Sequence, residues 1–109
     1  MPKHEFGIMK KAPKPGVRYD KYEPEKYNCI AVDDEMIEAI SERVSDVDTF
    51  WHTVDIPAKG LDCCGITLIP PKSLDTLIAV TDGIDKLSGL CELLRKAKKH
   101  NQYVIHFGV

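Results

Sequence analysis

Runs of apolar residues with the period of a strand alternate along this chain with runs that have the period of a helix. Residues 27–32 are nearly all apolar, which predicts a strand that lies centrally in a sheet. Residues 49–56 and 102–109 mix apolar with polar positions, which predicts strands at the sheet edges. Residues 62–69 predict a further apolar strand, which returns from 49–56 through the turn at 57–61 in a hairpin.

Two stretches between these strands have the helical pattern. An apolar stripe predicts a helix that begins at Asp33 or Asp34 and ends near residue 45 or 46. After residue 73 a longer stretch predicts two helices, which Asp82-Gly83 separates. The basic residues at 95–100 suit the negative end of the second helix dipole and the solvated face beside it; a phosphate contact is the minority interpretation.

From residue 27 onward the element order is β-α-β-β-α-β, that of a ferredoxin-like two-layer sandwich. The predicted fold class is therefore α+β, with an extra N-terminal strand and a long loop. Two interleaved right-handed units place the strands in the spatial order last, first, third, second. The hairpin is expected to gather apolar positions on one face, namely Phe50, His52, Val54 and Ile56 with Cys64, Ile66 and Leu68.

The first 26 residues predict a strand and an arm ahead of this core. Residues 5–10 place Phe6 and Ile8 on one face; this strand either covers the open edge beside the last strand or forms a flexible terminus. Residues 11–26 hold three prolines and almost no aliphatic side chains, which predicts a loop. We predict a single domain over residues 1–109, with 27–109 as the sandwich core.

Composition narrows the class of protein. A formal net charge of −2 provides no general field for nucleic acid or for an anionic membrane. No apolar run approaches the ~20 residues of a membrane span, and the start of the chain has no apolar signal-peptide core, so a cytoplasmic location is expected. The four cysteines include no Cys-x-x-Cys pair and are expected as free thiols. No cofactor is predicted.

Adjacent cysteines in the predicted hairpin are one candidate for chemistry. Either Cys63 or Cys64 is expected to share a strand face with His52, which is the minimum arrangement for a thiolate nucleophile. A small core cysteine beside a satisfied histidine explains the same pattern. Cys29 is expected on the neighbouring strand, where a redox pair is conceivable and reduced buried thiols are the simpler reading.

The histidines are the other candidate. His52 and His106 are expected at opposite sheet edges, roughly 14 Å apart, which is too far to share a metal ion. His4 approaches His106 only if the N-terminal strand pairs with the last strand. Two histidines without a third ligand make a poor zinc site, so no metal site and no catalytic residue are predicted.

The residues predicted to bind a partner lie on the hairpin and on the arm. Trp51 is expected on the sheet face opposite the chosen core face, where the arm shelters it or an interface covers it. The arm interleaves aromatic and basic side chains with acidic ones, which is typical of a plain surface loop or a protein contact rather than of nucleic-acid stacking. The predicted binding residues are Trp51, His52, Cys63, Arg18, Tyr19 and Tyr22.

These features favour a small cytoplasmic domain that docks on another protein as a regulator, an inhibitor or an immunity-type partner. The partner, or a second copy of the chain, is expected at the sheet face or at an edge strand; neither nucleic acid nor a membrane is expected. The alternative is a homodimeric small-molecule-binding protein or small enzyme, with a pocket on the sheet face near His52, Cys63, Trp51 and His106. A thiol enzyme that uses Cys63 or Cys64 is a third class, and enzymes as a whole are the less favoured reading.

Overall fold

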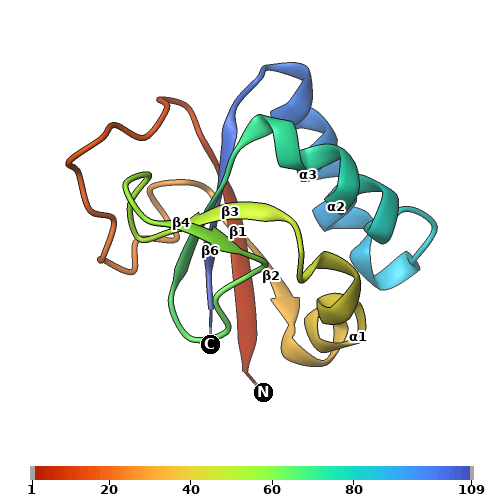
Figure 1. The fold of residues 1–109 in the computed structure, drawn as a ribbon. Coiled ribbons are helices and arrows are strands. Elements are labelled where there is room, and N and C mark those ends of the chain that lie inside the picture. The colour runs from red at the N-terminus through yellow and green to blue at the C-terminus, as the bar shows by residue number, and fades with distance from the viewer. Residues whose placement is uncertain (1, 109) are drawn as a thin grey trace.

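Residues 2–108, which the computed structural model describes, form an α+β fold in which three helices lie against one six-stranded sheet (Figure 1). Every pair of neighbouring strands is antiparallel. The strands are β1 (Lys3–Met9), β2 (Ile30–Asp33), β3 (Asp48–Trp51), β4 (Pro57–Lys59), β5 (Ile66–Ile69) and β6 (Tyr103–Phe107). The helices are α1 (Asp34–Val44), α2 (Leu74–Thr81) and α3 (Ser88–Lys99).

The strands lie in the order β2-β1-β6-β5-β3-β4, so the expected ferredoxin-like order is not found. β2 lies at an edge and not centrally, because β1 takes the place between β2 and β6. The last strand is central and not at an edge; Val109, which was predicted to belong to it, lies outside the described residues. The expectation that the N-terminal strand pairs beside the last strand is confirmed.

β1 and β6 take the centre of the sheet because side chains on both of their faces are buried. Phe6 and Met9 point to opposite faces and are 2% and 3% exposed. His4 and His106, the polar residues that give these strands a mixed appearance, are buried as well. In β2 only Val32 is buried, so the apolar run around residue 30 belongs to a strand with one covered face.

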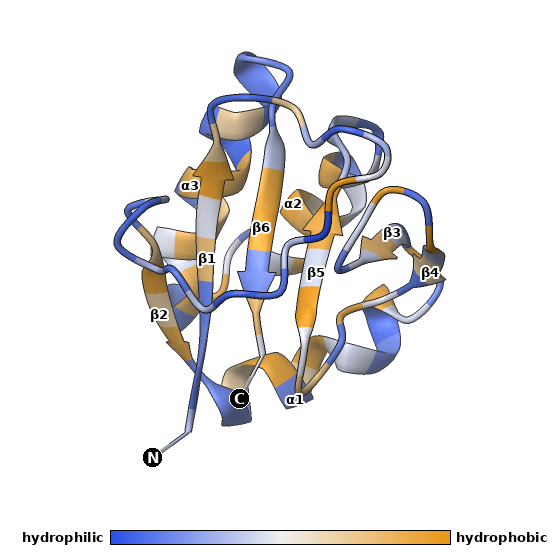
Figure 2. Ribbon diagram, turned by 90° about the vertical axis from the view of Figure 1, so that its left-hand side faces the viewer, coloured by the Kyte–Doolittle hydropathy of each residue, from blue (hydrophilic) through white to orange (hydrophobic). Residues whose placement is uncertain are grey.

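The two faces of the sheet have different covers. The three helices pack on one face, where the core cluster includes Phe6 and Val104. The segment between β1 and β2 crosses the other face, where Tyr19 and Tyr27 pack on a second cluster around Leu68. Figure 2 looks onto this second face, with β1, β6 and β5 side by side and the helices behind them. The arm is therefore part of the packed structure.

The predicted helices are confirmed to within a few residues. α1 covers the expected range, and α2 and α3 are separated at Gly83, which has a φ of 82°. α3 follows a single 3₁₀ turn at Asp85–Leu87 and ends before Asn101, which has a φ of 52°. Within residues 2–108 no helix combines the length and the apolar character that crossing a membrane requires.

The hairpin differs in detail from the prediction. β3 and β5 pair with Phe50 opposite Leu68, and these two side chains share a face with Ile66 as expected, although the arm and not the helices cover that face. β3 ends before His52, whose φ of 65° turns the chain out of the strand. The predicted turn contains β4, which pairs with the other side of β3 and forms the sheet edge. Cys64 lies in the exposed loop before β5 and not on the strand face.

Gly7 is the point of closest approach between β1 and the arm. A Cβ atom at this position would lie 2.6 Å from Tyr27 Cβ and 2.7 Å from Cys29 Sγ. Glycine is therefore required sterically, because only a residue without a side chain allows the arm to pack this closely on β1.

We expect Gly7→Ala to lower the free energy of unfolding by roughly 1–3 kcal/mol, because the new methyl group overpacks the contact between β1 and the arm. Gly89→Ala is the matched control, since its Cβ would meet only Ile30 Cδ1, at 3.8 Å, and alanine is the better helix former. Urea unfolding of both variants provides the measurement. Equal stability of Gly7→Ala and the parent protein would show that the arm does not lie where the structure places it.

Candidate functional site

A cleft lies where β1 extends beyond β2. β1 pairs with β2 only from Lys3 to Phe6, whereas it pairs with β6 up to Met9. Continued past Phe6, the register would place Cys29 opposite Gly7 and Asn28 opposite Ile8, but the φ of 49° at Asn28 turns the chain away from the ladder. The end of β1 therefore has no strand beside it on the β2 side.

The free edge presents the backbone groups of Ile8. Asp34 N–H donates to Pro2 C=O at 3.2 Å, which identifies the even-numbered residues of β1 as those whose N–H and C=O point toward β2. By this alternation the N–H and C=O of Ile8 point outward, past the end of β2. Among residues 2–108 no backbone hydrogen bond from a turn or loop reaches them. The edge can thus accept one further strand.

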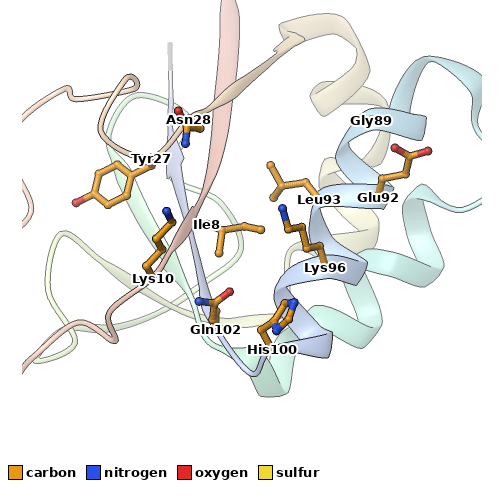
Figure 3. Close-up of a pocket in the computed structure, with 10 residues that line it drawn as sticks. All are labelled: Ile8, Lys10, Tyr27, Asn28, Gly89, Glu92, Leu93, Lys96, His100 and Gln102. Carbon is orange, nitrogen blue, oxygen red and sulfur yellow. The ribbon is translucent and has the colours of Figure 1, made fainter.

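One face of α3 forms the opposite wall of the cleft (Figure 3). Gly89, Leu93, Lys96 and His100 recur at helical spacing along that face. Ile8 and Leu93 form an apolar floor that continues into the core. With Lys10, Asn28 and Gln102 at the rim, the cleft has a volume of about 590 Å³ and combines an apolar floor with polar walls.

The cleft is cationic although the chain as a whole is mildly acidic. A second hollow of about 440 Å³ adjoins it, since both are lined by Ile8, Lys10, Tyr27 and Asn28. Glu92 is the acidic residue among the side chains that line the two hollows. None of the lining lysines forms an ion pair within the described part of the chain; they are Lys10, Lys11, Lys14, Lys26 and Lys96. The charges therefore remain free for an external anion.

Sequence reasoning did not find this cleft. The pattern explains the basic residues at 95–100 by the helix dipole, with a phosphate contact as the minority interpretation, and it makes Lys10 the last residue of a predicted strand. The helical spacing of Gly89, Leu93 and Lys96 places them on one face and is the signal that the sequence did contain. That this face lies across from Lys10 depends on the position of β1 in the sheet.

Of the predicted binding residues of the arm, Tyr19 and Tyr22 hold the arm on the sheet, and Arg18 forms an ion pair within the arm. Tyr19 N–H donates to the His52 carbonyl at 2.7 Å, and Arg18 pairs with Asp20 at 2.9 Å. The Tyr22 hydroxyl donates to the Glu5 carboxylate, and this hydrogen bond raises the pKa of Tyr22. Whether any of these residues also binds a partner stays a prediction.

The predicted binding residues of the hairpin lie at two different sites. His52 faces the arm: its Nδ1 lies 2.8 Å from Asp20 Oδ1, without the geometry of a hydrogen bond, and its Nε2 accepts a long bond of 3.5 Å from Ile66 N–H. Trp51 is 36% exposed, and it lines a separate cavity together with Cys63. Their role in binding a partner also stays a prediction.

The cysteines are not placed as the hairpin pattern suggested. Neither Cys63 nor Cys64 lies in a strand, so neither shares a strand face with His52; their Sγ atoms lie 3.3 Å apart in an exposed loop. The contact with Cys63 raises the pKa of Cys64, and burial raises the pKa of Cys29 to about 12. Both shifts oppose a thiolate at neutral pH. Cys29 precedes β2 and is separated from β5 by β1 and β6, contrary to expectation.

A chain of hydrogen bonds runs through the core from β5 to α1. Asp62 N–H donates to Thr67 Oγ1 at 2.8 Å, and Thr67 Oγ1 lies 3.2 Å from His106 Nδ1. His106 Nε2 lies 2.8 Å from His4 Nδ1, and His4 Nε2 lies 2.7 Å from Asp34 Oδ1. The expected approach of His4 to His106 is thus confirmed, and the expected position of His106 on an edge strand is wrong, because β6 lies inside the sheet.

One assignment of protons satisfies every group in this chain. Because Thr67 accepts from a backbone N–H, its hydroxyl proton is free to donate to His106 Nδ1. His106 then donates from Nε2 to His4, and His4 donates from Nε2 to the Asp34 carboxylate. His106 is neutral in this arrangement. Burial, and secondarily the neighbouring His4, lowers the pKa of His106 to about 3, which agrees with a neutral His106.

A scan against protein-family models and searches of curated proteins and of solved structures find no match to this chain. Among residues 2–108 no three histidine, cysteine, aspartate or glutamate side chains are arranged to hold a metal ion. The assignment of function therefore rests on the cationic cleft and on the other cavities of the fold.

The buried His106 predicts loss of stability in acid. Its pKa of about 3 in the folded protein lies below the ordinary value of 6.5, so below pH 6.5 the unfolded chain binds a proton that the folded protein does not. The contribution of His106 is therefore intact above pH 6.5 and falls as the pH is lowered toward 3.

We expect His106→Asn to have a lower free energy of unfolding than the parent protein at pH 7. This difference should shrink by about 2 kcal/mol between pH 6.5 and pH 5, because the parent protein loses stability as His106 of the unfolded chain takes up a proton, and asparagine does not titrate. Urea unfolding at each pH provides the measurement. A gap that is independent of pH would mean that His106 is not held neutral in the core.

Proposed function

We propose that this protein is a small binding domain that docks on another protein, and that it binds an extended acidic segment of that partner along the free edge of β1. The observation that carries the proposal is the outward-facing backbone of Ile8 beside a group of lysines that form no ion pair among residues 2–108. In keeping with the composition of the chain, we expect this to take place in the cytoplasm.

The backbone edge supports a strand as the bound form. A segment that continues the line of β2 beyond residue 30 would exchange hydrogen bonds with the N–H and C=O of Ile8, as in other cases of β-strand addition. Its alternate side chains would point to the two sides of the sheet, one set toward Leu93 and the other toward Tyr27. The apolar floor thus favours a small apolar residue at the position next to Ile8.

The charges support an acidic segment. Lys10 and Lys96 approach the cleft from its two walls, and Lys26 lies over the Tyr27 ring at 5.5 Å. Carboxylates of the bound segment would therefore meet ammonium groups on both sides of its backbone. Such pairs at a rim contribute mainly to specificity and to the rate of association.

A second candidate function is the binding of a small anionic molecule in the same cleft. The volume of about 590 Å³ falls within the range of ligand pockets, roughly 300–1,000 Å³. A small anion would use the same lysines but not the backbone of Ile8. A peptide whose backbone N–H groups are blocked therefore distinguishes strand addition from the binding of a small anion.

The first test uses a labelled peptide of alternating glutamate and valine, about six residues long, the length of a typical strand. We expect saturable binding with a dissociation constant in the micromolar range, and amide shifts at Ile8 and Lys10. The lysine-valine counterpart should not bind. A peptide with N-methyl groups on the edge that would face Ile8 should lose affinity about tenfold at unchanged charge. Equal binding of the N-methylated peptide would exclude strand addition and favour the small-anion candidate.

The second test uses variants on α3. Lys96→Glu should weaken the glutamate-valine peptide about tenfold, because it places a carboxylate in the cleft. Lys98→Glu is the matched control, since Lys98 lies on the same helix, pairs with Asp75 and does not line the cleft. Equal losses in both variants would show that only net charge matters. In gently purified native complexes, a stoichiometric partner should be lost with Lys96→Glu and kept with Lys98→Glu.

A further inference from the structure

A second cavity, of about 300 Å³, lies between α1 and the loop that follows β4. It shares no lining residue with the cationic cleft. Ile37 and Val44 of α1 form an apolar wall, and Trp51 forms another. His4 and Asp34 reach it from the end of the buried hydrogen-bond chain.

The Asp34 carboxylate is held in a fixed orientation at this cavity. His4, which is 2% exposed, holds Asp34 Oδ1 at 2.7 Å, and His106 holds His4 in turn. Within residues 2–108 Asp34 Oδ2 accepts no hydrogen bond and takes part in no ion pair. The side chain of Asp34 is 33% exposed. One oxygen is thus anchored and the other is free for a ligand.

Among residues 2–108, Asp34 Oδ2 has no cationic partner at this cavity. His4 contacts the carboxylate through Oδ1 alone, and His106 behind it is neutral. Lys59, the lysine that lines the cavity, has its ammonium group paired with Asp48. Glu38, one helical turn along α1 from Asp34, adds a second carboxylate at the rim.

We propose that this cavity binds a small organic ammonium ion with an apolar or aromatic body. The ammonium group pairs with Asp34 and, at the rim, with Glu38, while the body packs on Ile37, Val44 and the indole of Trp51. An aromatic wall next to a carboxylate is the arrangement that recognises such cations, because the ring face attracts positive charge and apolar groups alike. A carboxylate or phosphate ligand would be repelled by the same two side chains.

This site is independent of the cleft at the free edge of β1. The two lie at different ends of β1: His4 lines the one and Ile8 lines the other. The cleft is rich in lysine, and the cavity beside α1 presents carboxylates. The tests of the ammonium site and of the docking function proposed above are therefore independent of each other.

Trp51 is the one tryptophan of the chain, so its fluorescence reports on this cavity alone. Benzylamine is the probe, with benzyl alcohol and benzoate as neutral and anionic controls of the same shape. We expect a saturable change in Trp51 emission with benzylamine at millimolar concentration, and none with either control. A change that does not saturate, or that benzyl alcohol produces equally, would overturn the proposal.

Variants of the acidic residues at the start of α1 test which carboxylate binds the ammonium group. Asp34→Asn should weaken benzylamine about tenfold, and it keeps an oxygen that accepts from His4 Nε2. Asp33→Asn is the matched control, because Asp33 is the neighbouring residue, pairs with Lys3 at 3.9 Å and does not line the cavity. Glu38→Gln, on the exposed surface of α1, should weaken binding about threefold. Unchanged affinity in both Asp34→Asn and Glu38→Gln, with folding verified by urea unfolding, would exclude the site.

Discussion

The hydrogen bond between His4 and His106 is the interaction on which the arrangement of the sheet depends. Both imidazoles are almost fully buried on the helix-facing side of β1 and β6, and a buried polar group without a partner is costly. Each imidazole therefore requires the other strand as its neighbour, with Thr67 and Asp34 closing the two ends of the chain. This pairing accounts for the position of β1 between β2 and β6. It also joins the first and last strands of the chain, and the observed strand order differs from the expected one at this pairing.

The central position of β1 has a second consequence, at its other end. β1 and β2 are antiparallel neighbours, yet a long segment and not a short hairpin joins them. This segment runs across the face without helices, where Tyr19 N–H donates to the His52 carbonyl, before it returns to β2. Gly7 makes the close approach of Tyr27 and Cys29 possible, and Asn28 then turns the chain into β2. Because the turn at Asn28 precedes β2, β2 pairs only with Lys3 to Phe6 of β1, and the backbone of Ile8 has no strand beside it. The cationic cleft follows from this mismatch in strand length, together with the face that α3 presents to it.

Charge is separated along the molecule in a way that the net value of −2 conceals. Lysines that form no ion pair in the described part of the chain gather around the free end of β1, while the first turns of α1 carry the acidic residues Asp34, Glu35 and Glu38. The acidic side chains in the first turn suit the positive end of the helix dipole, which is a sufficient structural reason for Asp34 and Glu35. The lysines of the cleft have no comparable explanation within the chain. Because the helix dipole explains the acidic residues and nothing comparable explains the lysines, we assign the proposed docking function to the cleft.

The sequence by itself determined the local elements, because helices and turns depend on neighbouring residues. The apolar stripe of α1, the break at Gly83 and the end of α3 before Asn101 were all predictable from spacing and from residue types that favour turns. The register that brings Phe50 and Leu68 onto one face was predictable from alternation. The order of the strands was not, because β2 and β6 have the opposite burial from the one that their composition suggests. His106 made a central strand look mixed, and its partner His4 lies at the other end of the chain. Only the tertiary structure brings the two together, and with them the cleft beside Ile8 and the cavity beside Asp34.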